Sequence, residues 1–250
     1  MGITTEVRDH IAEVVMENPP VNALTVAGWY EVAKQVTEAG RRQDVSVVVL
    51  RAVGRGFNAG VDIKEMQATE GFDALVGANR GCHAAFKAVY ECEVPVVSAV
   101  NGYCLGGGIG LVGNSDVIVA AADATFAIPE IDRGALGVAT HLSRLVPPLK
   151  ARAMYFTAST ATAHDLEHHG SVWKVVPPDQ LRDAALEVAA SIADKDTRVM
   201  RMAKEAMNGI DLWDVNRSYR YEQGYTFEIN LLGVADEHRD RFVEKGTKGS

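Results

Sequence analysis

Two apolar runs, residues 45–50 and residues 94–100, each lead into a glycine-rich segment, and this repeated order is the strongest constraint on the fold. A short continuous apolar run bounded by turn-forming residues is typical of a buried strand. Helices are predicted before each run, at residues 26–39 and 71–90. Strand, helix and strand in this order indicate βαβ units, so we predict an α/β fold.

The rest of the chain divides into a strand-rich front and a helical tail. Residues 3–8 and 11–16 alternate apolar and polar side chains and predict a β-hairpin. Further strands are predicted at residues 117–121 and 125–128, and beyond Pro177 helices are predicted at residues 181–193, 198–208, 215–231 and 236–244. We expect a core domain at residues 1–190 and a helical region at residues 191–250 that serves docking or oligomerisation.

The composition argues against several classes of protein. Of the 250 residues, 47% are hydrophobic, which is enough for one sizeable core. The net charge of -8 does not supply the positive field that nucleic acids and anionic membranes require. No apolar run reaches the roughly 18 residues of a membrane span. Cys82, Cys92 and Cys104 lack the spacing of a disulfide framework or a metal site, so we expect reduced thiols and a cytoplasmic location.

The two glycine-rich segments, residues 55–66 and 101–111, are the candidate functional elements. Glycine lets a backbone approach a ligand closely. Gly106, Gly107 and Gly108 stand where a helix begins, and the first turn of a helix leaves N–H groups unpaired and favours negative charge. Two such turns that each offer one amide to the same carbonyl oxygen form an oxyanion hole.

These segments resemble the two signatures of the crotonases, the enoyl-CoA hydratase and isomerase superfamily. The quoted stretches are Gly60-Val61-Asp62-Ile63-Lys64-Glu65-Met66, and Ala99-Val100-Asn101-Gly102 followed by Gly106-Gly107-Gly108; the resemblance continues at residues 20–24, 126–130 and 242–245. It implies a crotonase spiral of ββα units whose helical C-terminal region packs on neighbours in a homotrimer or a dimer of trimers. It also implies that the oxyanion amides belong to Val61 and Gly107.

The resemblance further implies a site for the coenzyme A part of an acyl-CoA substrate, with no separate cofactor. The positions that match the CoA site are Pro20, Val21, Ala59, Asp62, Ile63, Lys64, Phe242 and Lys245. Phe242 and Lys245 match a C-terminal pair that reaches the nucleotide of a neighbouring subunit. A lysine ammonium suits such a phosphate as a compact charge.

Crotonases place carboxylates at up to three positions around the acyl group. In this chain those positions hold Gly110, Glu130 and Val138, so only Glu130 is acidic. Hydration in the family uses two carboxylates to hold and ionise one water, because proton delivery and water activation act in concert. A single carboxylate beside an oxyanion hole instead favours isomerisation, or water attack on a ketone that releases a CoA-stabilised carbanion.

A closer similarity favours the second of these reactions. Residues 56–62, 108–116, 133–137 and 140–142 are similar to the crotonase-type ring hydrolases of steroid degradation, which open one ring of a bicyclic β-diketone CoA ester. This similarity implies that Glu130, or Asp132 two residues later, activates the water. His83 and His141 are further candidates for the base, since histidine titrates near neutral pH.

Four other interpretations stay open. Residues 108–113 match GxGxxG, but the preceding strand ends several residues too early for a dinucleotide site, and NADH binding would decide it. An RNA-binding role, known among crotonases, disagrees with the acidic composition. An inactive scaffold is conceivable because two acid positions are empty, and enoyl-CoA hydratase or isomerase activity on fatty-acid-type substrates remains the alternative enzymatic reading. No GxSxG, Walker A or HExxH motif is present.

Overall fold

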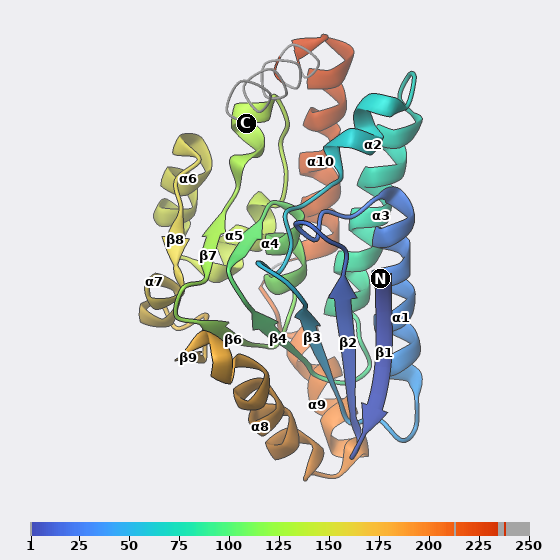
Figure 1. Ribbon diagram of the computed structural model, residues 1–250, viewed down its shortest axis with the longest axis vertical. Helices are drawn as coiled ribbons and strands as arrows, with labels where there is room; N and C mark the ends of the chain where they lie inside the picture. The colour runs from blue at the N-terminus through green and yellow to red at the C-terminus, as the bar shows by residue number, and fades with distance from the viewer. Residues whose placement is uncertain (1, 213, 235–237, 239–250) are drawn as a thin grey trace.

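The computed structural model describes residues 2–212, 214–234 and 238 (Figure 1). The strands are β1 Gly2–Arg8, β2 Ile11–Glu17, β3 Val47–Ala52, β4 Val96–Val100, β5 Tyr103–Leu105, β6 Val117–Ala121, β7 Thr125–Ala127, β8 Ala161–Thr162 and β9 Lys174–Val176. The helices are α1 Val26–Arg41, α2 Ile63–Ala68, α3 Asp73–Tyr90, α4 Gly107–Val112, α5 Ala139–Leu145, α6 Pro148–Thr157, α7 Ala163–His168, α8 Leu181–Ala193, α9 Thr197–Gly209 and α10 Val215–Leu231. Two short 3₁₀ helices are η1 Pro129–Arg133 and η2 Pro178–Gln180.

The larger sheet has the strand order β1-β2-β3-β4-β6-β9. β1 and β2 form the predicted antiparallel hairpin, and the remaining neighbours pair in parallel. Every residue of β4 is buried, as expected for a parallel strand covered on both faces. A smaller sheet has the order β5-β7-β8, and of its strands only β7 was predicted. The two strands that were missed, β5 and β8, are too short to show a periodic pattern in sequence.

Helices pack on the larger sheet and on one another to form a single apolar core. α1 runs along α3, and α8 lies against β3, β4 and β6 (Figure 1). α1 begins where the Thr25 hydroxyl accepts a hydrogen bond from the Gly28 amide at 3.1 Å. The predicted helices at residues 26–39 and 71–90 are confirmed, with small differences at their ends.

The helical tail is also confirmed for the part that the structure describes. α8 and α10 have the predicted bounds, α9 is one residue longer at each end, and the fourth predicted helix lies outside the described residues. The predicted division at residue 190 falls inside α8, whose Ala185 and Ala189 are buried in the core. Among the described helices, none is long and apolar enough to cross a bilayer.

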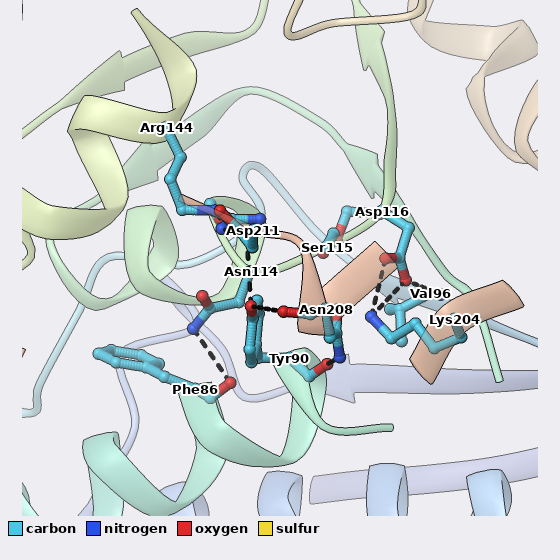
Figure 2. A network of polar contacts seen from close by, with 12 residues as sticks. Phe86, Tyr90, Val96, Asn114, Ser115, Asp116, Arg144, Lys204, Asn208 and Asp211 are labelled. Carbon is cyan, nitrogen blue, oxygen red and sulfur yellow. Dashed lines mark hydrogen bonds and ion pairs between the residues drawn. The ribbon is translucent and has the colours of Figure 1, made fainter. Parts of the chain in front are cut away.

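α9 presents its polar face to the core. Lys204 is only 4% exposed and its Nζ lies 2.7 Å from Asp116 Oδ1, while Asn208 donates to the Tyr90 carbonyl at 2.7 Å (Figure 2). Thr197 and Arg201 bond Ser46 and Glu93 from the same face. The opposite face carries a stripe of exposed apolar side chains at spacings of three and four residues: Val199, Met202, Ala206 and Ile210. In an ordinary amphipathic helix the apolar face packs on the core and the polar face is exposed, so α9 has the reverse arrangement.

Candidate active site

The two glycine-rich turns lie against each other, although 46 residues separate Gly60 from Gly107. Asn58 pairs with Cys104 in an isolated parallel bridge, and the Leu105 amide donates to the Asn58 carbonyl at 2.9 Å. A Cβ added to Gly107 would lie 3.5 Å from Cα of Gly60. The backbones that carry the two expected oxyanion amides therefore lie so close together that one methyl group would fill the space between them.

The backbone at Val61 is fixed from both sides. Leu24 donates to the carbonyl of Gly60 and accepts from the amide of Asp62, each at 2.9 Å. The buried Asn58 side chain accepts from the Gly60 amide at 2.8 Å, and Gly60 adopts a φ of +87°, which favours glycine. These contacts leave the Val61 amide between two restrained neighbours, on the wall of a cavity that Gly107 also lines.

Gly107 opens α4, where helix geometry leaves the first amides without intrahelical acceptors. The preceding Gly106 has a φ of +51°, and a Cβ there would lie 1.8 Å from Glu130 Oε1. The Glu130 carboxylate therefore rests on the glycine turn, next to the expected oxyanion amide of Gly107. No other residue type fits at position 106 without moving that carboxylate.

Residues of both turns, α3, η1, the loop before α5, and α10 line the cavity, which has a volume of about 150 Å³. Most of the walls are apolar. The lining residues are Ala59, Gly60, Val61, Ile63, Met66, Leu75, Ala78, Asn79, Cys82, Phe86, Gly107, Glu130, Arg133, Ala135, Leu136, Gly137, Val138, Tyr219, Thr226 and Asn230. A concave, mostly apolar site with a few polar groups is the usual form of a small-molecule site.

Glu130 and Asp132, the two candidate carboxylates, face different surroundings. In a 3₁₀ helix side chains three residues apart point the same way, so Glu130 and Arg133 both reach the cavity. Asp132 lies between them, is exposed, and is not among the lining residues. The geometry thus favours Glu130 as the base.

The environment of Glu130 suits a base. Its Oε2 atom is buried and has no hydrogen-bond partner among the described residues. Burial raises the pKa of Glu130 to about 7; the charge of Arg133 opposes this rise and that of Glu222 adds to it. A pKa near the working pH is what efficient proton transfer requires.

Neither candidate histidine lines the cavity. His141 is buried on α5 with its ring centroid 5.0 Å from those of Phe86 and Tyr219, and burial lowers its pKa to about 3. His83 is half-buried on α3 and stacks on Tyr219 at 6.3 Å. Both rings lie behind aromatic side chains that do line the cavity, so their contacts favour a packing role.

The structure places only some of the expected CoA-binding residues at the cavity. Ala59 and Ile63 line the cavity. Lys64 is exposed in the first turn of α2, and the Asp62 side chain caps that helix by accepting from the Lys64 amide at 2.8 Å. Pro20 is exposed and Val21 is half-buried, in the turn after β2. Phe242 and Lys245 lie outside the described residues.

The two empty acid positions have distinct structural explanations. A Cβ at Gly110 would lie 2.2 Å from Cζ of Phe86, so an aromatic ring occupies the space that a carboxylate there would need. Val138 is buried, lines the cavity, and immediately precedes α5 with a φ of +54°. The first position is closed by packing, and the second is an apolar part of the cavity wall.

Glu222 is a second acid near Glu130 that sequence reasoning missed. It projects from α10 and accepts from the amides of Ala139 and Thr140 at 3.1 and 3.3 Å, at the start of α5. Burial raises its pKa to about 7. Some 90 residues separate it from Glu130, and no local pattern marks it, because only the packing of α10 on α5 brings it there.

Comparison with known proteins identifies the family and the fold. Residues 6–248 match the family model described as enoyl-CoA hydratase/isomerase, so the chain belongs to this family of enzymes, whose substrates are acyl-CoA thioesters. The solved structure of an enoyl-CoA hydratase from Mycobacterium avium subsp. paratuberculosis superposes with a TM-score of 0.86 at 20% identity, covering 96% of this chain and 98% of that one. The expected crotonase fold is thereby confirmed.

Two relatives are much more similar in sequence. The "(7aS)-7a-methyl-1,5-dioxo-2,3,5,6,7,7a-hexahydro-1H-indene-carboxyl-CoA hydrolase" of Rhodococcus jostii is 65% identical over 247 residues, which are 98% of this chain and 96% of the relative. The protein of the same name from Mycobacterium tuberculosis is 66% identical over 235 residues, covering 94% of this chain and 95% of its own. The sequence similarity to crotonase-type ring hydrolases is therefore confirmed.

Proposed function

We propose that this enzyme hydrolyses a carbon–carbon bond in one ring of a bicyclic diketone CoA ester during steroid catabolism. Its two similar relatives are named as hydrolases of a dioxo-indene-carboxyl-CoA. The observation that carries the proposal is a cavity in which Glu130 is the single carboxylate among the described lining residues, beside the two turns of Val61 and Gly107. The Phe86 ring fills the place of the second carboxylate that hydration uses. This arrangement supports ring hydrolysis over the alternative of enoyl-CoA hydration.

The bond to be broken follows from the structure of such a diketone. The relatives' name places a ketone at C1, next to the methyl-bearing ring carbon C7a, and a second ketone at C5. The hydrogenated positions given in that name leave one double bond in the ring system, between C3a and C4. Breaking the C1–C7a bond puts an electron pair on C7a, and the C3a–C4 double bond conjugates that pair with a carbonyl group.

In the proposed mechanism, ionised Glu130 takes a proton from water as the water oxygen attacks C1. The tetrahedral adduct collapses, the C1–C7a bond breaks, and C1 becomes a carboxylic acid that ionises. The electron pair is delocalised as an enolate extending to the CoA thioester oxygen, which accepts hydrogen bonds from the amides of Val61 and Gly107. Glu130 returns its proton to the enolate, so water is the only co-reactant and no cofactor is required.

The test is to offer the purified protein the bicyclic diketone CoA ester in ¹⁸O-labelled water and to follow the products by mass spectrometry. We expect one added water whose labelled oxygen lies in the new carboxyl group. Crotonyl-CoA is the matched alternative substrate. Efficient hydration of crotonyl-CoA without ring opening would replace this proposal with the hydratase reading.

We also propose that the protein assembles as a homotrimer or a dimer of trimers through α9. Its apolar stripe, Val199, Met202, Ala206 and Ile210, faces outward while its polar face bonds the core. An exposed apolar helix face of this kind marks an interaction surface. A second copy of the chain is the expected occupant of this stripe.

We further propose a cytoplasmic location, because Cys82, Cys92 and Cys104 are buried free thiols.

A further inference from the structure

Arg133 is the one basic side chain among the residues that line the described cavity. It closes η1, three residues after Glu130, and 3₁₀ geometry directs both side chains to the same side. The charge of Arg133 lowers the pKa of Glu130, against the larger rise that burial causes. The cavity thus combines a base and a guanidinium against apolar walls.

The proposed reaction develops negative charge at two places. In the proposed mechanism the amides of Val61 and Gly107 serve only one of them, the enolate that includes the thioester oxygen. The other is the C1 oxygen, which becomes an alkoxide when water adds and then part of a carboxylate. In a protein with a net charge of -8, an apolar cavity needs a local cation to hold such an anion.

We infer that Arg133 forms a carboxylate subsite, which binds the ring ketone oxygen as it becomes anionic and then the carboxylate of the ring-opened product. This inference rests on the proposed ring hydrolysis and names the group that serves its second anion. A guanidinium presents a rigid fork of N–H donors that matches a carboxylate and the geminal oxygens of a hydrated ketone. Arg133 therefore acts on the half of the substrate that the oxyanion amides do not reach.

A binding measurement tests the subsite without requiring turnover. The first ligand is the CoA ester of the ring-opened acid, with its new carboxylate free. The second ligand is the same CoA ester with the new carboxylate converted to a methyl ester. Both are prepared chemically. Calorimetry at pH 6, where Glu130 is largely protonated, should show that Arg133→Gln weakens binding of the acid about tenfold or more and leaves the methyl ester unchanged. Equal losses for both ligands, or no loss, would overturn the subsite.

Kinetics test the role in the reaction. Arg133→Gln should lower kcat/KM for the diketone about 100-fold. Arg133→Lys should retain part of the kcat/KM that Arg133→Gln loses, because the lysine ammonium supplies a point charge. The rates are compared on the high-pH plateau, because an effect exerted only through the Glu130 pKa disappears there. Arg8→Gln is the matched control, since its side chain is 93% exposed on β1.

The two proposals fail in different ways. If the wild-type protein does not open the diketone, ring hydrolysis is wrong, whereas the binding comparison still reports on Arg133. If the wild-type protein opens the diketone and Arg133→Gln does so equally well on the plateau, the role of Arg133 is wrong and ring hydrolysis stands.

Discussion

Glu130 combines three features at the scale of a single residue. Its carboxylate rests on Gly106, its Oε2 atom is buried without a partner among the described residues, and it opens onto the cavity. A carboxylate in such surroundings is poorly solvated when ionised, which makes it a stronger base than an exposed one. Asp132 has the same chemistry but an exposed position.

Replacing Glu130 by glutamine should lower kcat about 10²- to 10⁴-fold, because the amide cannot accept a proton from water. Binding of a CoA ester should change little, since the oxyanion turns stay in place. Steady-state kinetics and calorimetry measure the two effects, with Asp132→Asn as the neighbouring control. A large loss in Asp132→Asn alone would transfer the role of base to that residue.

The pH dependence of kcat/KM should report the raised pKa of Glu130. The base acts in its ionised form, so kcat/KM should rise about tenfold per pH unit below a pKa of about 7 and level off above it. Glu222→Gln removes a charge that raises the pKa of Glu130. The rising part of the kcat/KM profile should therefore move to lower pH in this variant. A profile that is flat from pH 5 to 8 would contradict the assignment.

The contact of Gly110 with Phe86 predicts a stability effect. Gly110→Ala would place a Cβ 2.2 Å from Cζ of Phe86 and should destabilise the fold by about 1–3 kcal/mol through overpacking. Gly224→Ala, inside α10 with nothing within 4 Å, should instead stabilise it by about 0.5–1 kcal/mol. Urea unfolding distinguishes the two, and equal effects would contradict the close contact at Gly110.

At the scale of elements, α9 is held by polar groups. Figure 2 shows Lys204 pointing at Asp116, which also accepts from the Val96 amide at 2.8 Å, and Asn208 beside Tyr90. Arg144 and Asp211 form an ion pair in the same network. Such contacts fix the orientation of α9 while leaving its apolar stripe outward.

Removing one partner of the Lys204–Asp116 pair should be costly. Asp116→Asn leaves a buried ammonium without its counter-charge, so the free energy of unfolding should fall by about 3 kcal/mol. Lys204→Met should lower the free energy of unfolding by less, because the carboxylate that loses its partner, Asp116, is partly exposed. The double variant Asp116→Asn/Lys204→Met should recover most of the loss in urea unfolding, and additive losses would show that the pair is not coupled.

At the scale of the whole molecule, the outward stripe of α9 predicts the assembly. Met202, 70% exposed, lies within this stripe, and Met202→Glu would place a charge at the contact with another copy. Light scattering after size exclusion should show a trimer or hexamer for the wild type and a smaller species for the variant. Glu205→Gln, exposed but off the stripe, is the control; a monomeric wild type would contradict the proposal.

Most of the helices and strands, and the two glycine turns, could be predicted from the amino-acid sequence alone. Periodicity and turn chemistry act over a few residues, so the hairpin, the long helices and the principal strands could be located from them. The segments around Val61 and Gly107 were recognisable because a tight backbone approach requires glycine within each segment. Very short strands such as β8 carry no such local signal.

Which side chains share the cavity could not be predicted from the sequence, because it depends on how the chain packs. The winding of η1 separated Glu130 and Arg133 from Asp132, the packing of α3 placed Phe86 over Gly110, and α10 brought Glu222 to the start of α5. Each of these depends on contacts between segments far apart in the chain, or on the direction in which one turn faces. A local sequence pattern predicts neither the distant contacts nor the direction of a turn, because both depend on how the whole core packs.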